Sequence, residues 1–264
     1  MKKGYRFVKT TVDIFASFIG VLILSPLFLL LIVLIDLEGC FTKSKNKKKV
    51  KEAEEVATLP ENDETPGKID EPACKFVTKT YFGGAILGQE RLGKNKKKFF
   101  LFKFRSMKEA DEKFDCKKQT VEEGDSRVTL IGKFIRRFKI DELLQLINVL
   151  RGDMNLVGPR PLLPEYAEEY APWMEEKFLE KPGMTGLAQV NGGTYLSLEE
   201  RSYFDVYYVR KVNAAMDIKI LFKTIAVIFV GEKKLKKDVS QEDIASFIGE
   251  SYYAKKENSD QTKE

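Results

Sequence analysis

The feature that most constrains this chain is an uncharged apolar run near its N-terminus, IFASFIGVLILSPLFLLLIVLI, which extends from Ile14 to Ile35. About 20 apolar residues are enough for a helix to cross the hydrocarbon core of a bilayer. The run is too long for the apolar part of a secretory signal peptide, and no small-residue cleavage site follows it. The sequence therefore predicts a helix that enters a membrane.

Two features of this run argue against a simple crossing. Ser25 and Pro26 lie near its middle, and a proline inside a helix removes a hydrogen bond and kinks or breaks the helix. Basic residues flank both ends, namely Lys2, Lys3, Arg6 and Lys9 before the run and Lys43, Lys45, Lys47, Lys48 and Lys49 after it. Positively charged flanks stay in the cytoplasm, and a single crossing cannot keep both there. We expect a re-entrant helix with both termini cytoplasmic; one kinked transmembrane helix is the alternative.

Composition divides the chain into four parts. Residues 1–42 contain the membrane helix, and residues 43–76 are so rich in Lys, Glu, Asp and Pro that we interpret them as a polar insertion or linker. Residues 77–232 form the expected cytoplasmic domain, and residues 233–264 a polar C-terminal tail. The predicted fold class is mixed α/β and helix-rich with a short β-hairpin, in a monotopic membrane protein with interfacial helices.

Local patterns predict one hairpin and two apolar helices. Gly93-Lys94-Asn95 marks a turn before the β-prone run FFLFKF, and we place Lys103 and Arg105 on or just after that strand, as ligand-binding or ordinary solvent-facing charges. A helix is expected to follow Thr129 and to continue to a stop at Gly152. The later run DIKILFKTIAVIFV is expected to begin with Asp217 as N-cap and to be a core or an interfacial helix.

Composition also limits the chemistry. The chain contains no histidine, so Ser-His and Cys-His catalysis, histidine bases and histidine metal sites are excluded. Its 3 cysteines lack metal-ligand spacing, which is typical of a reducing compartment without a disulfide framework. The net charge of +5 favours an acidic partner such as a lipid head group, a phosphorylated substrate or a nucleic acid.

Two adjacent carboxylates, Asp141 and Glu142, begin the most apolar part of the helix that follows Thr129. An N-cap and a first-turn acid would explain them structurally. However, Arg136 lies about one helical turn upstream, and Arg160 is held in an extended backbone between two prolines. Glycines at 186, 192 and 193 would allow close backbone approach to a ligand. Carboxylates, arginines and glycine loops together indicate phosphate chemistry assisted by Mg²⁺.

Several motifs resemble those of the bacterial sugar transferase family, the monotopic polyprenyl-phosphate phosphoglycosyl transferases. They are KFRSM, DELLQLINVLRGDMNLVGPRPLLPEY, KPGMTGLAQVNGG and FDVYYV, together with the Ser-Pro break in the apolar run. The resemblance implies transfer of a phospho-sugar from a UDP-sugar to undecaprenyl phosphate, with release of UMP, through a covalent aspartyl intermediate. Such a reaction initiates assembly of a cell-surface glycoconjugate, namely an exopolysaccharide, capsule, O-antigen or glycoprotein glycan.

The resemblance also implies residue roles. Asp141 would be the nucleophile, Glu142 would help to hold Mg²⁺, and Arg136 and Arg160 would bind phosphate. Four further residues are expected to bind substrate: Lys103, Arg105, Gln189 and Asn191. Two departures from the family pattern are a long polar segment after the membrane helix and Gly193, where the family often has arginine.

The expected partners are a UDP-sugar, undecaprenyl phosphate and membrane lipids, at the cytoplasmic face of the inner membrane, and a homodimer is left open. A non-catalytic membrane-tethered module that recruits a partner is the alternative function. A nucleic-acid partner is not expected, because the chain has an apolar N-terminal run and no nucleic-acid-binding motif.

Overall fold

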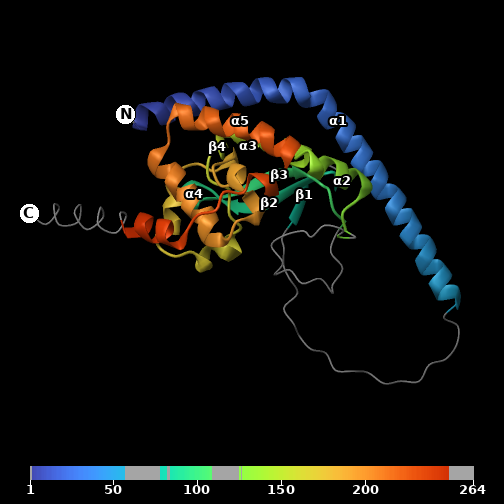
Figure 1. Ribbon diagram of the computed structural model, residues 1–264. Coiled ribbons are helices and arrows are strands. Elements are labelled where there is room, and N and C mark those ends of the chain that lie inside the picture. The colour runs from blue at the N-terminus through green and yellow to red at the C-terminus, as the bar shows by residue number, and fades with distance from the viewer. Residues whose placement is uncertain (1, 57–77, 82–83, 109–124, 126, 250–264) are drawn as a thin grey trace, which may run out of the picture. The chain divides into compact units, whose positions relative to one another are not determined.

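The computed structural model describes residues 2–56, 78–81, 84–108, 125 and 127–249 (Figure 1). The chain divides into two compact units. The first unit comprises Met1–Leu24, Gln89–Lys103 and Glu142–Glu264. The second unit comprises Ser25–Gly88 and Phe104–Asp141.

The N-terminal helix α1 spans Lys2–Val56 and contains Pro26. Its part from Gly4 to Gly39 is long and apolar enough to cross a membrane by length and composition, and only 17% of its most apolar window is buried. The helix continues past residue 42, the expected end of the membrane segment, and residues 57–76 of the expected insertion lie outside the described residues. The re-entrant topology stays a prediction.

The part of α1 in the first unit has its polar residues on the inside. Lys9, Asp13 and Ser17 are buried and recur every four residues, so they share one face of the helix. Except for Thr11 and Gly4, the residues exposed on the other faces are apolar, including Phe7, Val8, Val12, Phe15, Phe18 and Leu22. A helix in water shows the reverse pattern, so this distribution indicates an apolar surrounding for α1.

The expected hairpin is confirmed. Strand β2 (Ile86–Leu92) and strand β3 (Lys98–Phe104) are joined through the short helix η2 (Lys94–Lys96), and β1 (Thr78–Tyr81) completes a three-stranded sheet of order β1-β2-β3. The turn has positive φ at Asn95 and Lys96, and the Gly93 amide donates to the carbonyl of Lys97.

The prediction of a single helix from Thr129 to Gly152 is wrong. Helix α2 (Leu130–Arg137) begins as predicted, with the Thr129 hydroxyl accepting from the Gly132 amide. The chain then leaves the helix at Lys139, where φ is 57°, passes through η3 (Ile140–Glu142) and restarts as α3 (Gln145–Leu150). The expected stop is confirmed at Gly152, which has φ 79°.

A small parallel ribbon joins distant parts of the first unit. Strand β4 (Asn155–Val157) pairs with β5 (Gly183–Thr185), with Asn155 opposite Gly183. A Cβ on Gly183 would lie 2.0 Å from the Gly158 nitrogen, and one on Gly186 would lie 2.1 Å from the Gly158 oxygen. The close backbone approach expected for Gly186 is therefore to the backbone of Gly158, where a ligand was expected. Between the strands lie η4 (Pro164–Glu169) and η5 (Met174–Leu179).

Two helices cover the ribbon, preceded by η6 (Gln189–Asn191) and η7 (Gly193–Tyr195). Helix α4 (Leu198–Lys211) begins with a capping box, and α5 (Ala214–Val230) begins at Asn213, whose side chain accepts from the Met216 amide. The prediction of Asp217 as N-cap is therefore wrong. Asp217 lies one turn inside α5 and is buried against α1. The core of this region contains Val157, Val190, Tyr208, Val209, Val212, Ile220 and Val227.

The expected polar tail is packed in its first part. After η8 (Lys233–Leu235), residues 241–249 are helical, and Ile244 and Phe247 are buried. The Phe247 ring lies 4.9 Å from the Tyr203 ring, and the Arg210 guanidinium stacks on it at 4.0 Å. Two apolar residues at helical spacing are enough to dock this segment, although its overall composition is polar.

Candidate active site

An open cleft of about 230 Å³ lies in the first unit. Its polar lining comes from β2, β3, η3, α3, the Pro159–Pro161 segment and η6, and its floor includes Leu101, Pro161, Gly183 and Met184. The polar lining residues are Arg91, Lys103, Glu142, Gln145, Arg160 and Gln189. Four of the residues expected from the sequence, Lys103, Glu142, Arg160 and Gln189, are therefore brought together.

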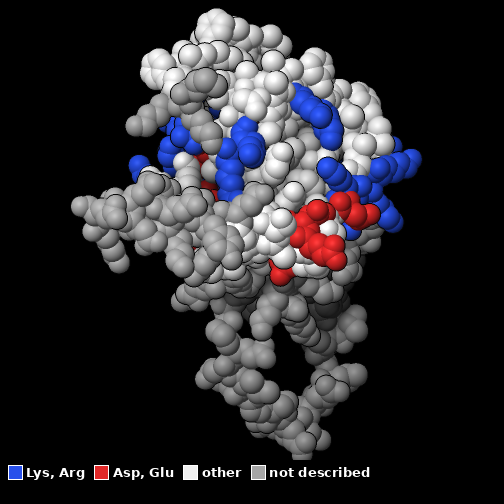
Figure 2. Space-filling view, turned by 60° about the vertical axis from the view of Figure 1, so that its left-hand side comes forward, with Lys and Arg blue, Asp and Glu red and all other residues white. Residues whose placement is uncertain are grey.

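The cleft is organised around the carboxylate of Glu142. Its Oε1 atom lies 3.1 Å from the Lys103 ammonium and 3.5 Å from the Arg160 guanidinium. In the part of the chain that the structure describes, Glu142 is the only acid that lines the cleft, whereas Arg91, Lys103 and Arg160 are cationic. The lining therefore has an excess of positive charge, which favours an anionic ligand. Figure 2 shows that Lys and Arg side chains also gather in patches on the surface of the chain.

Backbone hydrogen bonds hold the chain on both sides of Arg160. On one side of it, the Gly183 amide donates to the Pro159 carbonyl at 2.9 Å. On the other side, the Leu92 amide donates to the Leu162 carbonyl at 2.8 Å. These bonds fix the backbone on both sides of Arg160, whose conformation is also restricted by the following Pro161, while Pro159 has its own φ fixed.

Asn148 positions Lys103 by binding the backbone of strand β3 next to it. Its side chain donates to the Phe100 carbonyl at 2.7 Å and accepts from the Phe102 amide at 3.0 Å. Asn148 is 0% exposed, and its two hydrogen bonds fix strand β3 on both sides of Leu101. Gln145, one turn earlier, lines the cleft itself. Gln189 is held by its Nε2 donating to the Met184 carbonyl at 3.1 Å, while its buried Oε1 has no hydrogen-bond partner among the described residues.

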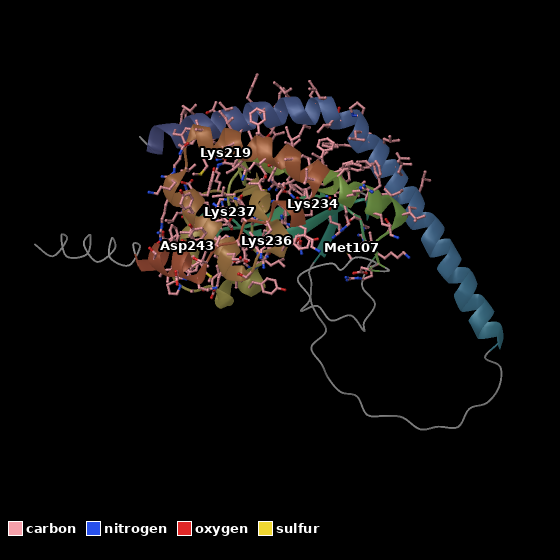
Figure 3. The ribbon with its side chains drawn as sticks, viewed as in Figure 1. Met107, Lys219, Lys234, Lys236, Lys237 and Asp243 are labelled. Carbon is pink, nitrogen blue, oxygen red and sulfur yellow. The ribbon has the colours of Figure 1, made fainter. Side chains whose placement is uncertain are left out.

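Three expected site residues belong to the second unit. Asp141 is buried in η3 and is joined to Glu142 by the peptide bond at the end of that unit. The Arg136 guanidinium donates to the Ser106 hydroxyl at 3.4 Å and to the sulfur of Met107 at 3.5 Å (Met107 is labelled in Figure 3). The Arg105 side chain donates to the Gly84 carbonyl at 2.5 Å, so it anchors a loop.

Asn191 is not among the residues that line the cleft. It is buried, its Nδ2 donates to the Leu187 carbonyl at 2.8 Å, and its Oδ1 accepts from the Lys223 ammonium at 3.0 Å. These bonds make Asn191 an internal anchor for η6. The pKa of Lys223 is lowered, first by burial and then by the charges of Lys219 and Lys237 (both labelled in Figure 3).

The turn after Asn191 is closed by an acid that sequence reasoning missed. Gly193 has φ 52°, and the Glu232 carboxylate accepts from the Thr194 amide at 2.9 Å and the Thr194 hydroxyl at 2.8 Å. A Cβ on Gly193 would lie 2.4 Å from a Glu232 oxygen. Glu232 thus occupies the space that a side chain at position 193 would need.

Arg91 is a cleft residue that the sequence reasoning also missed. Its guanidinium donates to the Gln89 side chain at 2.7 Å and to the Pro161 carbonyl at 3.4 Å. The signal was available, because alternate residues of a strand share a face and the paired strand contributes Leu101 and Lys103 to the same cleft.

The donor set limits how a magnesium ion could bind. Among the described residues, no three His, Cys, Asp or Glu side chains form a group that could hold a metal ion. Mg²⁺ needs only one or two protein carboxylates when phosphate oxygens and water complete its octahedron. Glu142 supplies one such carboxylate to the cleft, so the residues present fit an ion that is completed by a phosphorylated ligand.

Comparison with known proteins identifies the family to which the chain is similar. Residues 73–231 match the model of the family described as bacterial sugar transferase. The chain is 43% identical over 172 residues to the UDP-galactose-lipid carrier transferase of Erwinia amylovora, with 58% of this chain and 35% of that protein covered. It is 40% identical over 158 residues to the UDP-glucose:undecaprenyl-phosphate glucose-1-phosphate transferase of Escherichia coli, with 57% of this chain and 34% of that protein covered.

A third relative matches the chain over a longer range and at lower identity. The chain is 32% identical over 233 residues to the UDP-N-acetylgalactosamine-undecaprenyl-phosphate N-acetylgalactosaminephosphotransferase of Aeromonas hydrophila. That match covers 86% of this chain and 45% of the relative. The chain thus spans less than half the length of each of these three relatives.

Proposed function

Because the chain belongs to the bacterial sugar transferase family, we propose that it transfers a sugar 1-phosphate from a UDP-sugar to undecaprenyl phosphate and releases UMP. The observation that carries the proposal is the cationic cleft around Glu142, with Lys103 and Arg160 on the same carboxylate oxygen. Asp141, the proposed nucleophile, immediately precedes Glu142 in the chain.

The proposed reaction has two displacements at one phosphorus atom. A carboxylate oxygen of Asp141 attacks the β-phosphorus of the UDP-sugar, the bond from that phosphorus to the bridging oxygen breaks, and UMP leaves with that oxygen. An oxygen of undecaprenyl phosphate then attacks the same phosphorus, and the aspartyl carboxylate is released. The product is undecaprenyl-diphosphate-sugar, and a covalent nucleophile of this kind gives ping-pong kinetics.

The cleft residues have roles that follow from their charges. Lys103, Arg160 and Arg91 offset the negative charge of the diphosphate, and the arginine forks can each donate two hydrogen bonds to phosphate oxygens. Arg136 is proposed to bind phosphate from the second unit. A magnesium ion, when bound, would neutralise charge on the leaving UMP, and Glu142 would be its protein ligand.

The lipid acceptor requires a site at the level of the head groups. Helix α5 exposes an apolar face made of Ile218, Leu221, Phe222, Ile225 and Phe229, and most exposed residues in the first part of α1 are apolar as well. Such faces are typical of helices that lie in a membrane interface. We place the protein on the cytoplasmic face of the inner membrane, with both termini cytoplasmic, where its product would initiate a cell-surface glycoconjugate.

The test is UMP release from a panel of UDP-sugars by detergent-solubilised protein with undecaprenyl phosphate and Mg²⁺. The names of the relatives include galactose, glucose and N-acetylgalactosamine, so the panel contains at least these three UDP-sugars. We expect release with one or a few of them, and a covalent phospho-sugar on Asp141 when the lipid is omitted.

Asp141→Asn is the diagnostic variant, because asparagine keeps the size of the side chain and removes the nucleophile. We expect no turnover and no adduct by intact-protein mass spectrometry, with an unchanged melting temperature. Full turnover by this variant would exclude the covalent mechanism at Asp141. No UMP release by folded wild-type protein from any UDP-sugar would favour the non-catalytic recruitment module.

A further inference from the structure

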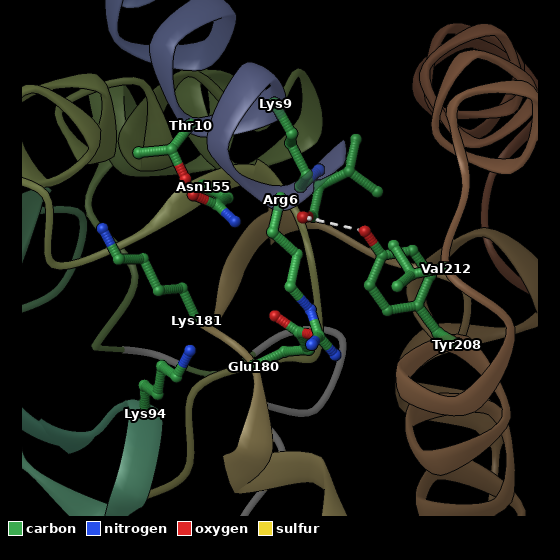
Figure 4. A pocket seen from close by; sticks show the side chains of 10 residues that line it. Arg6, Lys9, Thr10, Lys94, Asn155, Glu180, Lys181, Tyr208 and Val212 are labelled. Carbon is green, nitrogen blue, oxygen red and sulfur yellow. Dashed lines mark hydrogen bonds and ion pairs between the residues drawn. The ribbon is translucent and has the colours of Figure 1, made fainter. Parts of the chain in front are cut away.

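The first unit contains a second cavity, of about 400 Å³, that shares no lining residue with the cleft (Figure 4). We propose that it binds the phosphate of a glycerol-type anionic lipid head group. Its lining residues are Arg6, Lys9, Thr10, Lys94, Asn155, Val157, Glu180, Lys181, Tyr208 and Val212.

The ribbon of β4 and β5 separates the cavity from the cleft. Asn155 and Gly183 are partners in that ribbon, and Asn155 lines the cavity while Gly183 lines the cleft. The cavity is therefore a neighbour of the proposed active site and is distinct from it. Occupation of the cavity and turnover in the cleft can be measured separately.

The charges of the cavity are unbalanced. Among the described residues, four cations line it, and Glu180 is the only acid that does so. Arg6 pairs with Glu180, and Lys9 pairs with Asp217, which lies outside the lining. Lys94 and Lys181, on one side of the cavity in Figure 4, make no side-chain hydrogen bond or ion pair among the described residues. Two ammonium groups therefore remain for an anion, and phosphate matches them in charge and size.

A buried amide adds a polar contact. Asn155 is 5% exposed, and its Oδ1 has no hydrogen-bond partner among the described residues. An unpaired buried acceptor is costly, so a ligand that donates a hydrogen bond there gains affinity. The hydroxyl of a glycerol head group is such a donor. Phosphate and hydroxyl together satisfy the two lysines and the amide.

The position of the cavity favours a lipid as the source of this phosphate. Arg6, Lys9 and Thr10 form its wall on α1, and the adjacent residues Phe7 and Val8 are exposed and apolar. Basic side chains next to an apolar helix surface lie at the head-group level of a bilayer. Cytoplasmic leaflets carry anionic lipids, which attract such basic positions.

The test is equilibrium binding of phosphatidylglycerol to the purified full chain in neutral detergent, with phosphatidylcholine as the uncharged comparison. The Lys94→Gln/Lys181→Gln variant removes both ammonium groups and is expected to bind phosphatidylglycerol at least about tenfold more weakly, equivalent to about 1.4 kcal/mol. The matched control is Lys233→Gln/Lys234→Gln, which removes two exposed lysines outside the cavity and is expected to bind like the wild type.

Further experiments distinguish a lipid phosphate from a soluble phosphate, and the cavity from the cleft. Asn155→Asp places a negative charge in the cavity and is expected to weaken binding as well. Glycerol 3-phosphate and inorganic phosphate are added as competitors, and displacement at equal concentration would assign the cavity to a soluble phosphate and overturn the lipid assignment. Wild-type affinity in a folded Lys94→Gln/Lys181→Gln protein would overturn the site. UMP release is measured in parallel, and its failure leaves the lipid-binding result interpretable.

Discussion

The buried ion pair between α1 and α5 gives the sharpest stability prediction. The Lys9 ammonium lies 2.6 Å from Oδ2 of Asp217, and the two side chains are 6% and 9% exposed. Asp217 also accepts hydrogen bonds from the hydroxyls of Tyr5 and Tyr208, and Lys9 lies 3.7 Å from a carboxylate oxygen of Asp13. Lys9→Met keeps the length of the apolar stem and removes only the charge and its donors.

The magnitude follows from what remains after the substitution. Removing one partner of a buried ion pair costs about 3–5 kcal/mol, because the other charge is left uncompensated. Two tyrosine hydroxyls continue to donate to Asp217, so we expect the lower end, about 3 kcal/mol. The loss is expected to appear as a lower midpoint of chemical denaturation in detergent, with near-complete restoration in Lys9→Met/Asp217→Asn, which removes both charges.

Lys219→Met is the matched control, because Lys219 lies on the same α5 helix as Asp217 but is exposed. It is expected to change the free energy of unfolding by no more than about 0.5 kcal/mol. Equal midpoints for Lys9→Met and Lys219→Met would refute the reasoning. They would mean that the contact between α1 and α5 adds nothing to stability.

Three further predictions concern titration, charge geometry and the 193 turn. Burial first, and then the Asp217 charge, raise the pKa of Tyr208. The stabilisation by its protonated hydroxyl is therefore complete at neutral pH and should decrease as pH rises above about 10, the unfolded tyrosine pKa. In a pH series of melting temperatures, Tyr208→Phe should reduce this alkaline decrease. Arg160→Lys keeps the charge but loses the planar fork, and the KM for UDP-sugar should rise about tenfold, with an unchanged KM as the contrary result. Gly193→Arg should lower the free energy of unfolding by about 1–2 kcal/mol, because a left-handed backbone and displacement of Glu232 both disfavour a side chain there. An unchanged denaturation midpoint would show that the turn accommodates arginine without cost.

The elements that were predictable carry their signal within a few residues. The hairpin around Gly93 follows from the β-prone run FFLFKF and from the turn residues before it, and both are local properties. The break at Lys139 has no such signature, because the sequence is compatible with helix on both sides of it. Asp217 stands before a strongly apolar run and was therefore interpreted as a cap. Only its contact with Lys9, far away in the sequence, shows that it is a buried acceptor.

The site was predictable to the extent that it lies in motifs. Lys103, Glu142, Arg160 and Gln189 come from four separate segments. The pattern of residues linked Glu142 with Arg160, and only the resemblance to a family added Gln189 as a substrate-binding residue. Arg91 lies outside every quoted motif and was missed, although strand alternation placed it on the face of the cleft. The cavity lined by Lys94 and Asn155 was not predictable, because its residues come from five segments that have no shared pattern.

The polar face of α1 explains how a long apolar helix and a polar cleft can be parts of one unit. In a lipid environment the hydrophobic effect does not drive helices together, and polar contacts and close packing do so. Lys9 binds Asp217, Gly20 lies against Leu146, and the Asp13 carboxylate accepts from the Leu156 amide at 3.1 Å. Leu156 is in β4, and the partner strand of β4 supplies Gly183 and Met184 to the cleft floor. The polar contacts of α1 and the lining of the cleft are thus joined through one two-stranded ribbon, so substitutions at Asp13 should disturb the cleft as well as the packing of α1.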